Sequence, residues 1–124
     1  MDSYDIVIVG AGTAGLSAGI YGARAKRSTM ILDRKRPGGQ AATTEKMENY
    51  PGFPEVIGGR ELTERFRRHA EAMGAVILRG EAVSFAEEDG AYVIVTREGA
   101  SFRARSLILA NCACIKEIAV NLPV

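Results

Sequence analysis

A glycine-rich turn near the N-terminus is the feature that most restricts how this chain can fold. It follows YDIVIV (4–9), a run rich in β-branched apolar residues that is typical of a buried parallel strand. In the next segment, GAGTAG, Gly10, Gly12 and Gly15 form the pattern G-x-G-x-x-G. A run rich in small residues, LSAGIYGARAKR, then predicts a helix, and STMILD (28–33) predicts a second buried strand. Together these segments predict a βαβ unit with a right-handed crossover.

Each part of this turn has a mechanical reason in a dinucleotide site. Gly10 permits the tight turn, Gly12 leaves room for a pyrophosphate to approach the backbone, and Gly15 lets the helix pack closely on the strand. The N-terminus of the helix adds unpaired N–H groups and a partial positive charge. Asp33, at the end of the second predicted strand, can accept hydrogen bonds from ribose hydroxyls. A glycine-rich turn without a ligand is the competing interpretation, and the combination of strand, helix and acid disfavours it.

Asp33 also bears on the identity of the dinucleotide. Its carboxylate would repel a 2′-phosphate, which favours FAD or NAD over NADP at this site. Arg34, Lys35 and Arg36 follow directly and would favour NADP, but a solvated cluster of charges is the simpler interpretation. The glycine pattern alone does not separate FAD from NAD.

The middle of the chain predicts a long loop and then a well-defined helix. Residues 34–58 are rich in proline and glycine and show no apolar periodicity, and ordered loops of this length are usually functional. GRELTERFRRHAEAMGA (59–75) predicts a helix with one apolar face, Glu-to-Arg pairs four residues apart and Gly74 as its C-terminal cap. The apolar face comprises Leu62, Phe66, Ala70 and Met73, and the pairs are Glu61 with Arg65 and Glu64 with Arg68. His69 flanks the apolar face and is interpreted as a boundary residue, not a catalytic one.

The last third of the chain predicts only strands. AVIL (75–78) predicts a third parallel strand. GEAVSFAEEDG, AYVIVTREG and ASFRAR are short alternating runs separated by the turn signals Asp89-Gly90 and Glu98-Gly99, which predicts a three-stranded antiparallel meander. SLILA (106–110) then has the composition of a buried strand. The predicted fold class is α/β: a Rossmann-like parallel sheet with helices on its faces and a small antiparallel meander.

Charge and composition exclude several classes of function. The 16 basic and 15 acidic residues give a net charge of +1, which argues against binding to nucleic acid or to an anionic membrane. The N-terminal apolar run is too short for a membrane span and has no basic leader. Two cysteines two residues apart make no disulfide framework, so a reducing, cytoplasmic setting is the default. No pattern of metal ligands is visible.

The long loop carries a resemblance that the glycine pattern does not. PGGQ followed after a short spacer by ENYPGF resembles the low-molecular-weight thioredoxin reductases and their close flavoprotein relatives, whose corresponding loop closes over the flavin. The meander is also a feature of that family, as is a last strand ending in Ala-Thr-Gly, which here reads LILANC. The resemblance covers residues 4 to about 110. It implies FAD as the cofactor and residues 1–124 as the first part of a FAD-binding domain.

The resemblance also assigns binding roles to particular positions. It places the FAD pyrophosphate at the first helical turn, the adenosine ribose at Asp33 and the flavin along the long loop. The residues so implied are Gly10, Gly12, Thr13, Ala14 and Gly15 at the turn, Asp33 at the ribose, Gly39 and Gln40 along the ribityl chain and ring, Asn49 at the flavin ring, Val83 near the adenine and Ala110 opposite the first strand. Consecutive glycines at 38 and 39 permit a positive φ and a close backbone approach. Hydrogen bonding within the loop is the alternative role for Gln40 and Asn49.

Two parts of the chain depart from the family pattern, the start of the first predicted helix and the segment after the last predicted strand. Thr13 stands where proline is common, and proline there is helpful but not required. Asn111 and Cys112 replace Thr and Gly after the last strand, which adds a side chain at the cofactor edge. Cys112 and Cys114 form Cys-x-Cys, whereas the family's redox pair is Cys-x-x-Cys on a second domain. A disulfide between residues i and i+2 of an extended segment would strain the limit of about 7 Å between Cα atoms, so two reduced thiols are predicted.

The resemblance implies an oxidoreductase that passes electrons from NADPH through FAD to thioredoxin or a small disulfide. In this family a second domain binds NADPH, and a later segment adds a closing strand and a flavin-binding aspartate. Neither is found in these 124 residues, so the chain alone is predicted to be inactive and to have no catalytic residues of its own. The alternative is a non-catalytic FAD- or NAD-binding module, or an inactive remnant, that pairs with another chain or with a second copy.

Overall fold

The sheet of this protein runs through nearly the whole chain. The computed structural model describes residues 1–35, 37–110 and 119–121. They form a seven-stranded mixed sheet with the order β3-β2-β1-β6-β5-β4-β7. The strands are β1 (Asp2–Val9), β2 (Thr29–Asp33), β3 (Val76–Arg79), β4 (Ala82–Glu88), β5 (Ala91–Thr96), β6 (Ser101–Leu109) and β7 (Ala119–Asn121). The helices are α1 (Thr13–Arg24), the short 3-10 helix η1 (Gly39–Thr43) and α2 (Gly59–Met73).

The parallel half of the sheet confirms the predicted βαβ unit. β1 lies between β2 and β6 and is parallel to both, and β3 extends the sheet beyond β2. Ile8 of β1 is in register with Ile31 of β2 on one side and with Ile108 of β6 on the other. The β-branched composition of β1 and β2 therefore fits strands that are covered on both faces. SLILA was predicted to be a buried strand, but Ile108 and Leu109 of β6 are 38% and 41% exposed.

β6 differs from the prediction in one respect. ASFRAR and SLILA were expected to be separate strands, but Ser101–Leu109 is one continuous strand. Its first residues are antiparallel to β5, and the strand from Phe102 onward is parallel to β1. The change from the alternating run ASFRAR to the apolar run SLILA suggested two strands, and it coincides with the point where β6 loses β5 as a neighbour. The chain changes its neighbours at this point, not its direction.

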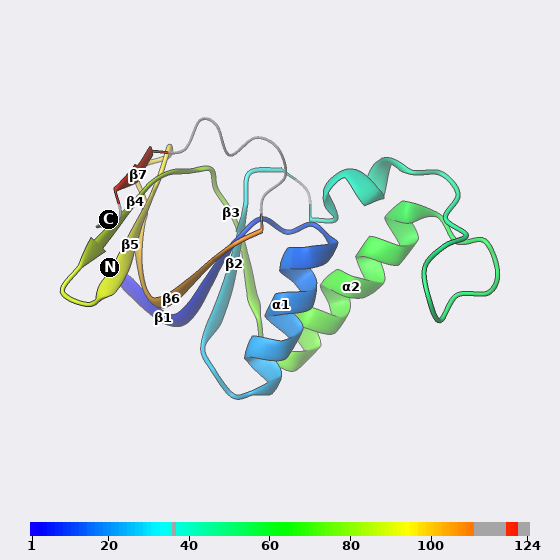
Figure 1. The fold of residues 1–124 in the computed structure, drawn as a ribbon, viewed down its shortest axis with the longest axis horizontal. Coiled ribbons are helices and arrows are strands. Elements are labelled where there is room, and N and C mark those ends of the chain that lie inside the picture. Colours follow the sequence, from blue (N-terminus) through cyan, green and yellow to red (C-terminus); the bar gives the residue numbers. More distant parts are fainter. Residues whose placement is uncertain (36, 111–118, 122–124) are drawn as a thin grey trace.

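The two faces of the sheet are covered by different elements. Successive side chains of a strand point to opposite faces, and β1 follows this rule: Val7 and Val9 pack with Phe85 and Ile94 of the meander, whereas Ile8 packs with residues of the two helices. Figure 1 shows both helices on one side of the parallel strands and the meander strands β4 and β5 on the other. The meander thus closes the second face in place of a helix.

α2 takes the predicted amphipathic form. Leu62 and Ala70 are fully buried and Phe66 is partly buried, while Met73 at the helix end is 38% exposed. Gly74 has φ 112° and caps the C-terminus, as predicted. Both predicted ion pairs form, at 2.9 Å between Arg65 and Glu61 and at 3.2 Å between Arg68 and Glu64. No helix in the described part of the chain has the length and apolar character to cross a membrane.

The segment between β2 and α2 has more structure than its composition predicts. It contains η1, and Met47 and Ile57 form a two-way backbone bridge with N···O distances of 2.8 and 3.2 Å. Tyr50 within this loop packs edge-on against Phe66 of α2, with 5.5 Å between ring centroids. The bridge and the aromatic contact fix the loop against α2. In Figure 1 the loop lies by the start of this helix, away from the meander.

Candidate dinucleotide-binding site

A large cavity lies where the parallel strands end. Its volume is about 1010 Å³, and it is lined by the last residues of β1 and β2, the first turn of α1, most of η1, one face of α2, the start of β4 and Ala110. In open α/β sheets this is the edge at which ligands bind. The volume suits a ligand larger than a mononucleotide, since ordinary small-molecule pockets measure roughly 300–1,000 Å³.

Glycine occupies each of the three positions in the first turn for a different reason. Gly10 has φ 110°, a conformation that favours glycine, and its N–H donates to the carbonyl of Leu32 at 2.8 Å. A Cβ at Gly15 would lie 1.8 Å from the carbonyl oxygen of Gly10, so the fold itself excludes a side chain there. Gly12 has φ −75°, and a Cβ there would meet nothing closer than 3.8 Å. The protein's own backbone and packing therefore give no reason for glycine at 12, whereas a ligand against the turn would.

A second pair of glycines faces the first turn. Gly38 and Gly39 have φ values of 120° and 62°, as expected from their sequence. Gly38 forms a bridge with Gly12, and its N–H donates to the carbonyl of Ala11 at 2.5 Å. A Cβ at Gly39 would lie 3.0 Å from the Cα of Gly12. Two side-chain-free turns thus meet beside the N-terminus of α1, where Gly12 supplies no side-chain cap and the first turn holds no acidic residue.

Asp33 lies at the end of β2 and lines the same cavity. Burial raises the pKa of its carboxyl above the ordinary value of 3.8, and backbone hydrogen bonds from Ala11, Arg34 and Lys35 oppose that rise. Its main-chain carbonyl accepts a hydrogen bond of 2.8 Å from the N–H of Gly80, which joins β2 to the entry of the meander. The carboxylate is thus held at the cavity wall, in a position to accept hydrogen bonds from hydroxyl groups.

The structure brings most of the sequence-predicted site residues together. Those that line the cavity are Gly10, Gly12, Thr13, Ala14, Asp33, Gly39, Val83 and Ala110. Gly15 lies one step behind them, at the contact between α1 and the turn. Gln40 follows Gly39 in η1. Asn49 is exposed in the loop that leads to α2 and is not among the lining residues, so its approach to a flavin ring stays a prediction.

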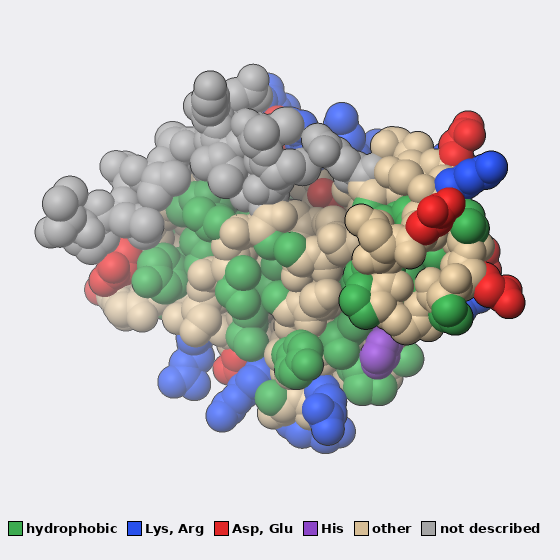
Figure 2. Space-filling model, turned by 45° about the vertical axis from the view of Figure 1, so that its right-hand side comes forward, with side chains coloured by type: hydrophobic (Ala, Val, Ile, Leu, Met, Phe, Trp, Pro, Cys, Tyr) green, Lys and Arg blue, Asp and Glu red, His purple; other side chains and the backbone are tan. Residues whose placement is uncertain are grey.

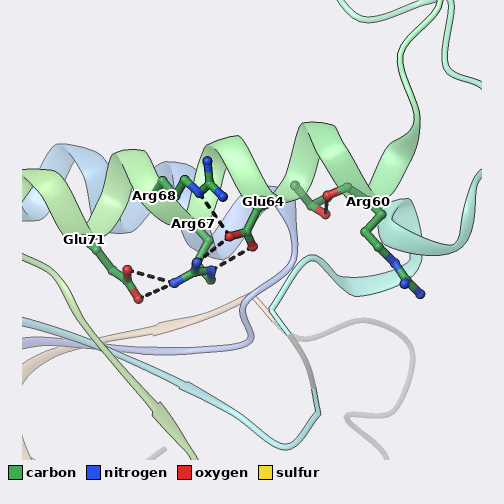
Figure 3. A network of polar contacts seen from close by, with 6 residues as sticks. Arg60, Glu64, Arg67, Arg68 and Glu71 are labelled. Carbon is green, nitrogen blue, oxygen red and sulfur yellow. Dashed lines mark hydrogen bonds and ion pairs between the residues drawn. The ribbon is translucent and has the colours of Figure 1, made fainter.

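One face of α2 belongs to the site and was not identified from the sequence. Arg60, Thr63, Glu64 and Arg67 line the cavity, and Figure 3 shows the ionic network built on this face. Arg67 donates from Nε to Glu64 at 2.9 Å and also from Nη2 to Glu64, while its Nη1 contacts both carboxylate oxygens of Glu71 at 2.8 and 2.9 Å. Hydrogen bonds from Arg67 lower the pKa of Glu64 to about 2. These four residues are spaced by three, four and seven positions, and this helical spacing was the signal in the sequence that could have placed them on one face.

His69 and the cysteines stand apart from this cavity. His69 is exposed and borders a smaller groove with Tyr21, Tyr50 and Phe66. Figure 2 shows the histidine at the surface beside hydrophobic side chains, in keeping with its predicted boundary position. Asn111, Cys112 and Cys114 lie outside the described residues, so the prediction of two reduced thiols stays a prediction.

The fold and the cavity together define an α/β protein with the Rossmann-like fold that is typical of dinucleotide-binding domains. The chain belongs to the pyridine nucleotide-disulphide oxidoreductase family, whose profile matches residues 4–121. It is 39% identical to a thioredoxin reductase of Bacillus subtilis over 117 residues, which are 94% of this chain and 36% of that protein. It is 43% identical to a thioredoxin reductase of Treponema pallidum over 110 residues, which are 89% of this chain and 36% of that protein.

Solved structures agree with these relatives. The thioredoxin reductase of T. acidophilum superposes with a TM-score of 0.82 at 38% identity, over 88% of this chain and 35% of that one. The thioredoxin reductase of Lactococcus lactis gives a TM-score of 0.81 at 35% identity, over 86% and 34%. The resemblance drawn from PGGQ and ENYPGF is therefore confirmed. The chain spans about a third of the length of the relatives that it matches.

Proposed function

We propose that residues 1–124 are the FAD-binding portion of a thioredoxin-reductase-like oxidoreductase. The observation that carries the proposal is the free space at Gly12, where the two glycine turns meet at the N-terminus of α1. A pyrophosphate at this point would accept hydrogen bonds from the unpaired amides of the first helical turn. Nothing else in the local packing requires glycine at 12.

The remaining contacts follow the order of groups along FAD. The amides of Thr13 and Ala14 bind the pyrophosphate, and Asp33 accepts hydrogen bonds from the adenosine ribose. Val83, at the start of β4, lies by the adenine. Gly39 and Ala110 line the cavity, and in this proposal Gly39 and Gln40 would lie along the ribityl chain and the ring while Ala110 would close the wall beside β1. When bound, FAD supplies the capacity to accept and pass on two electrons.

The activity of the complete protein follows from the family. Two electrons would pass from NADPH through FAD to one disulfide, of thioredoxin or of a small molecule. These 124 residues contain one glycine pattern and no Cys-x-x-Cys. The nicotinamide site and the dithiol of this proposal therefore come from further sequence, from a complementing chain or from a second copy.

The visible spectrum of the purified chain after incubation with FAD tests the proposal. A flavin band that co-elutes with the protein in gel filtration is the expected result, and Gly12→Val should remove the band without changing the circular dichroism. A chain that stays colourless but binds NAD by calorimetry would overturn the flavin assignment and leave the fold intact.

A non-catalytic nucleotide-binding module is the second candidate, and the single glycine pattern favours it. An NADPH oxidation assay with thioredoxin as acceptor separates the two. The chain alone is expected to show no turnover under either candidate. Turnover that appears when the other two-thirds of a related reductase is added in trans would support the oxidoreductase, whereas FAD binding that never supports turnover would support the module.

A further inference from the structure

Arg67 is the least exposed arginine of those that form ion pairs in the described residues. Its side chain is 30% exposed, against 57% to 80% for Arg65, Arg68, Arg97 and Arg105. It projects from the middle of α2 into the wall of the cavity. Surface ion pairs on helices usually point to solvent and contribute little. A network directed at a cavity calls for a different explanation.

The guanidinium of Arg67 is fixed in place and keeps one donor uncommitted. Glu64, three residues earlier, accepts hydrogen bonds from Nε and Nη2, and both carboxylate oxygens of Glu71, four residues later, accept from Nη1. Nη2 carries two N–H groups, and within the described residues its contact with Glu64 occupies one of them. Arg68 also contacts Glu64, and the network of two arginines and two glutamates carries no net charge. It therefore presents an oriented donor without repelling an anion.

The face of α2 that carries Arg67 is joined to the phosphate-binding turn by direct packing. One helical turn before Arg67, Thr63 is buried, and its Oγ1 would lie 2.7 Å from a Cβ at Gly38. Gly38 in turn bridges to Gly12. The second glycine turn therefore lies between α2 and the first glycine turn and contacts both. A ligand that enters against Gly12 meets the exposed side of these elements.

A pyrophosphate needs more hydrogen-bond donors than the first turn of α1 provides. The N-terminus of a helix offers roughly half an elementary charge, and no basic side chain lies in that first turn. A phosphate group is bound most strongly by a charged donor of fixed geometry, for which arginine is the preferred residue. Among the lining residues of α2, Arg60 lies apart from the network in Figure 3, whereas Arg67 is held by it.

We infer that Arg67 is a further dinucleotide-binding residue, which donates a charge-assisted hydrogen bond from Nη2 to a phosphate oxygen of the cofactor. Glu64 and Glu71 are positioning residues that hold the guanidinium in the cavity wall. The inference rests on the proposed function, since it names a contact to the dinucleotide of the same site.

The test is the dissociation constant for FAD of Arg67→Gln, measured by calorimetry at low and at high ionic strength. Loss of one charge-assisted hydrogen bond should weaken binding about 10- to 100-fold and should reduce the salt dependence of binding. Arg67→Lys should restore part of the affinity because it keeps the charge without the planar fork. Arg68→Gln is the matched control: it removes a neighbouring arginine from the same Glu64 but lies outside the cavity lining.

The outcomes separate the inference from the proposed function. If the unaltered chain binds FAD and Arg67→Gln binds it as tightly as Arg68→Gln does, the inference is wrong and the proposed function stands. If Arg67→Gln loses affinity but keeps the full salt dependence and also loses thermal stability relative to Arg68→Gln, Arg67 acts through the packing of α2 and the inference is again wrong. If the unaltered chain binds no FAD, both fail together.

Discussion

Gly12 and Gly15 stand three residues apart in one motif, yet the structure gives them opposite reasons. A side chain at Gly15 would collide with the backbone of Gly10, whereas one at Gly12 would find ordinary space. Packing therefore requires glycine at 15, whereas at 12 only the proposed pyrophosphate would require it. Both positions are glycine in the sequence motif, so only their packing in the fold separates the two roles.

Alanine substitutions should separate them in solution. Gly15→Ala is expected to lower the free energy of unfolding by about 1 to 3 kcal/mol or more, since backbone must move to admit the new Cβ. Gly12→Ala is expected to cost less than about 1 kcal/mol, the usual range for an N-cap change, while weakening FAD binding. Urea denaturation and calorimetry measure the two effects. Equal loss of stability in both variants would contradict this division of roles.

Asp33 should make stability depend on pH in an unusual direction. Burial raises its pKa above 3.8, so the folded state favours the protonated form. The corresponding stabilisation is present below pH 3.8 and is lost as pH rises through the raised pKa. Asp33→Asn cannot ionise, so its free energy of unfolding should rise relative to that of the unaltered chain as pH rises from 3.8 through the raised pKa. The same variant should bind FAD less tightly. Denaturation curves without cofactor between pH 3 and 7 measure the difference.

Asp5 supplies a control of opposite sign for this measurement. A backbone hydrogen bond from Ser28 lowers its pKa, so its contribution is present above pH 3.8 and is lost as pH falls. Asp5→Asn should thus lose stability relative to the unaltered chain at pH 7 and approach it in acid. If both variants followed the same trend with pH, the burial of Asp33 would not be the cause.

Single residues also show where sequence reasoning reached its limit. Gly10, Asp33 and Gly39 could be placed because a turn, a strand end and a positive φ each leave a local signature. Arg67 could not, since an arginine flanked by glutamates at helical spacing is usually a solvated face. Which of several charged faces of a helix borders a cavity depends on how the helix packs, and the packing of α2 on the glycine turns is a tertiary property.

At the scale of elements, the docking of α2 on η1 decides the shape of the cavity. The N–H of Gly59 donates to the carbonyl of Thr44 at 2.8 Å. A Cβ at Gly59 would lie 1.8 Å from the carbonyl oxygen of Ala41, whereas a Cβ at Gly58 would meet nothing closer than 3.5 Å. The start of α2 is therefore pressed against η1 at a single glycine. The helix itself was predictable from its period, but this contact was not.

Gly59→Ala should loosen this contact although alanine is the better helix former by about 1 kcal/mol. We expect the overlap with Ala41 to lower the free energy of unfolding by about 1 to 3 kcal/mol and to speed proteolysis within residues 44–58. Gly58→Ala is the matched control and should cost less than about 1 kcal/mol. Limited proteolysis and thermal unfolding of the two variants provide the comparison. If Gly59→Ala were as stable as Gly58→Ala, η1 would be able to move away from the new Cβ without cost, and the prediction would be wrong.

For the molecule as a whole, the fold class could be predicted because strand composition changes along the chain. Apolar, β-branched runs marked the parallel strands, and alternating runs with Asp-Gly and Glu-Gly turns marked the meander. The continuity of β6 could not be predicted, since a strand that exchanges one neighbour for another changes from an alternating to an apolar composition, as two separate strands would. That continuity joins the two halves into one sheet and brings Val83 and Ala110 to the same cavity as Gly12.

The same strand gives this chain an open backbone edge. In the described residues β5 pairs with β6 only up to Ala104, so residues 105–109 have β1 as their sole neighbour. Ile108 and Leu109 are 38% and 41% exposed there. An exposed apolar edge of this kind is a site for pairing with another chain. We therefore expect the chain to self-associate in a concentration-dependent way.

A charge on that edge should suppress the association, because lysine is a common means of blocking strand pairing. Ile108→Lys is expected to shift the chain toward monomer in sedimentation velocity over a tenfold range of concentration, with little change in circular dichroism. Val56→Lys is the matched control, since Val56 is 53% exposed but lies in the loop before α2, away from the sheet edge. If Val56→Lys reduced association as much as Ile108→Lys, general surface hydrophobicity would be responsible and not the edge of β6. If the unaltered chain remained a monomer throughout, the edge would be protected in solution.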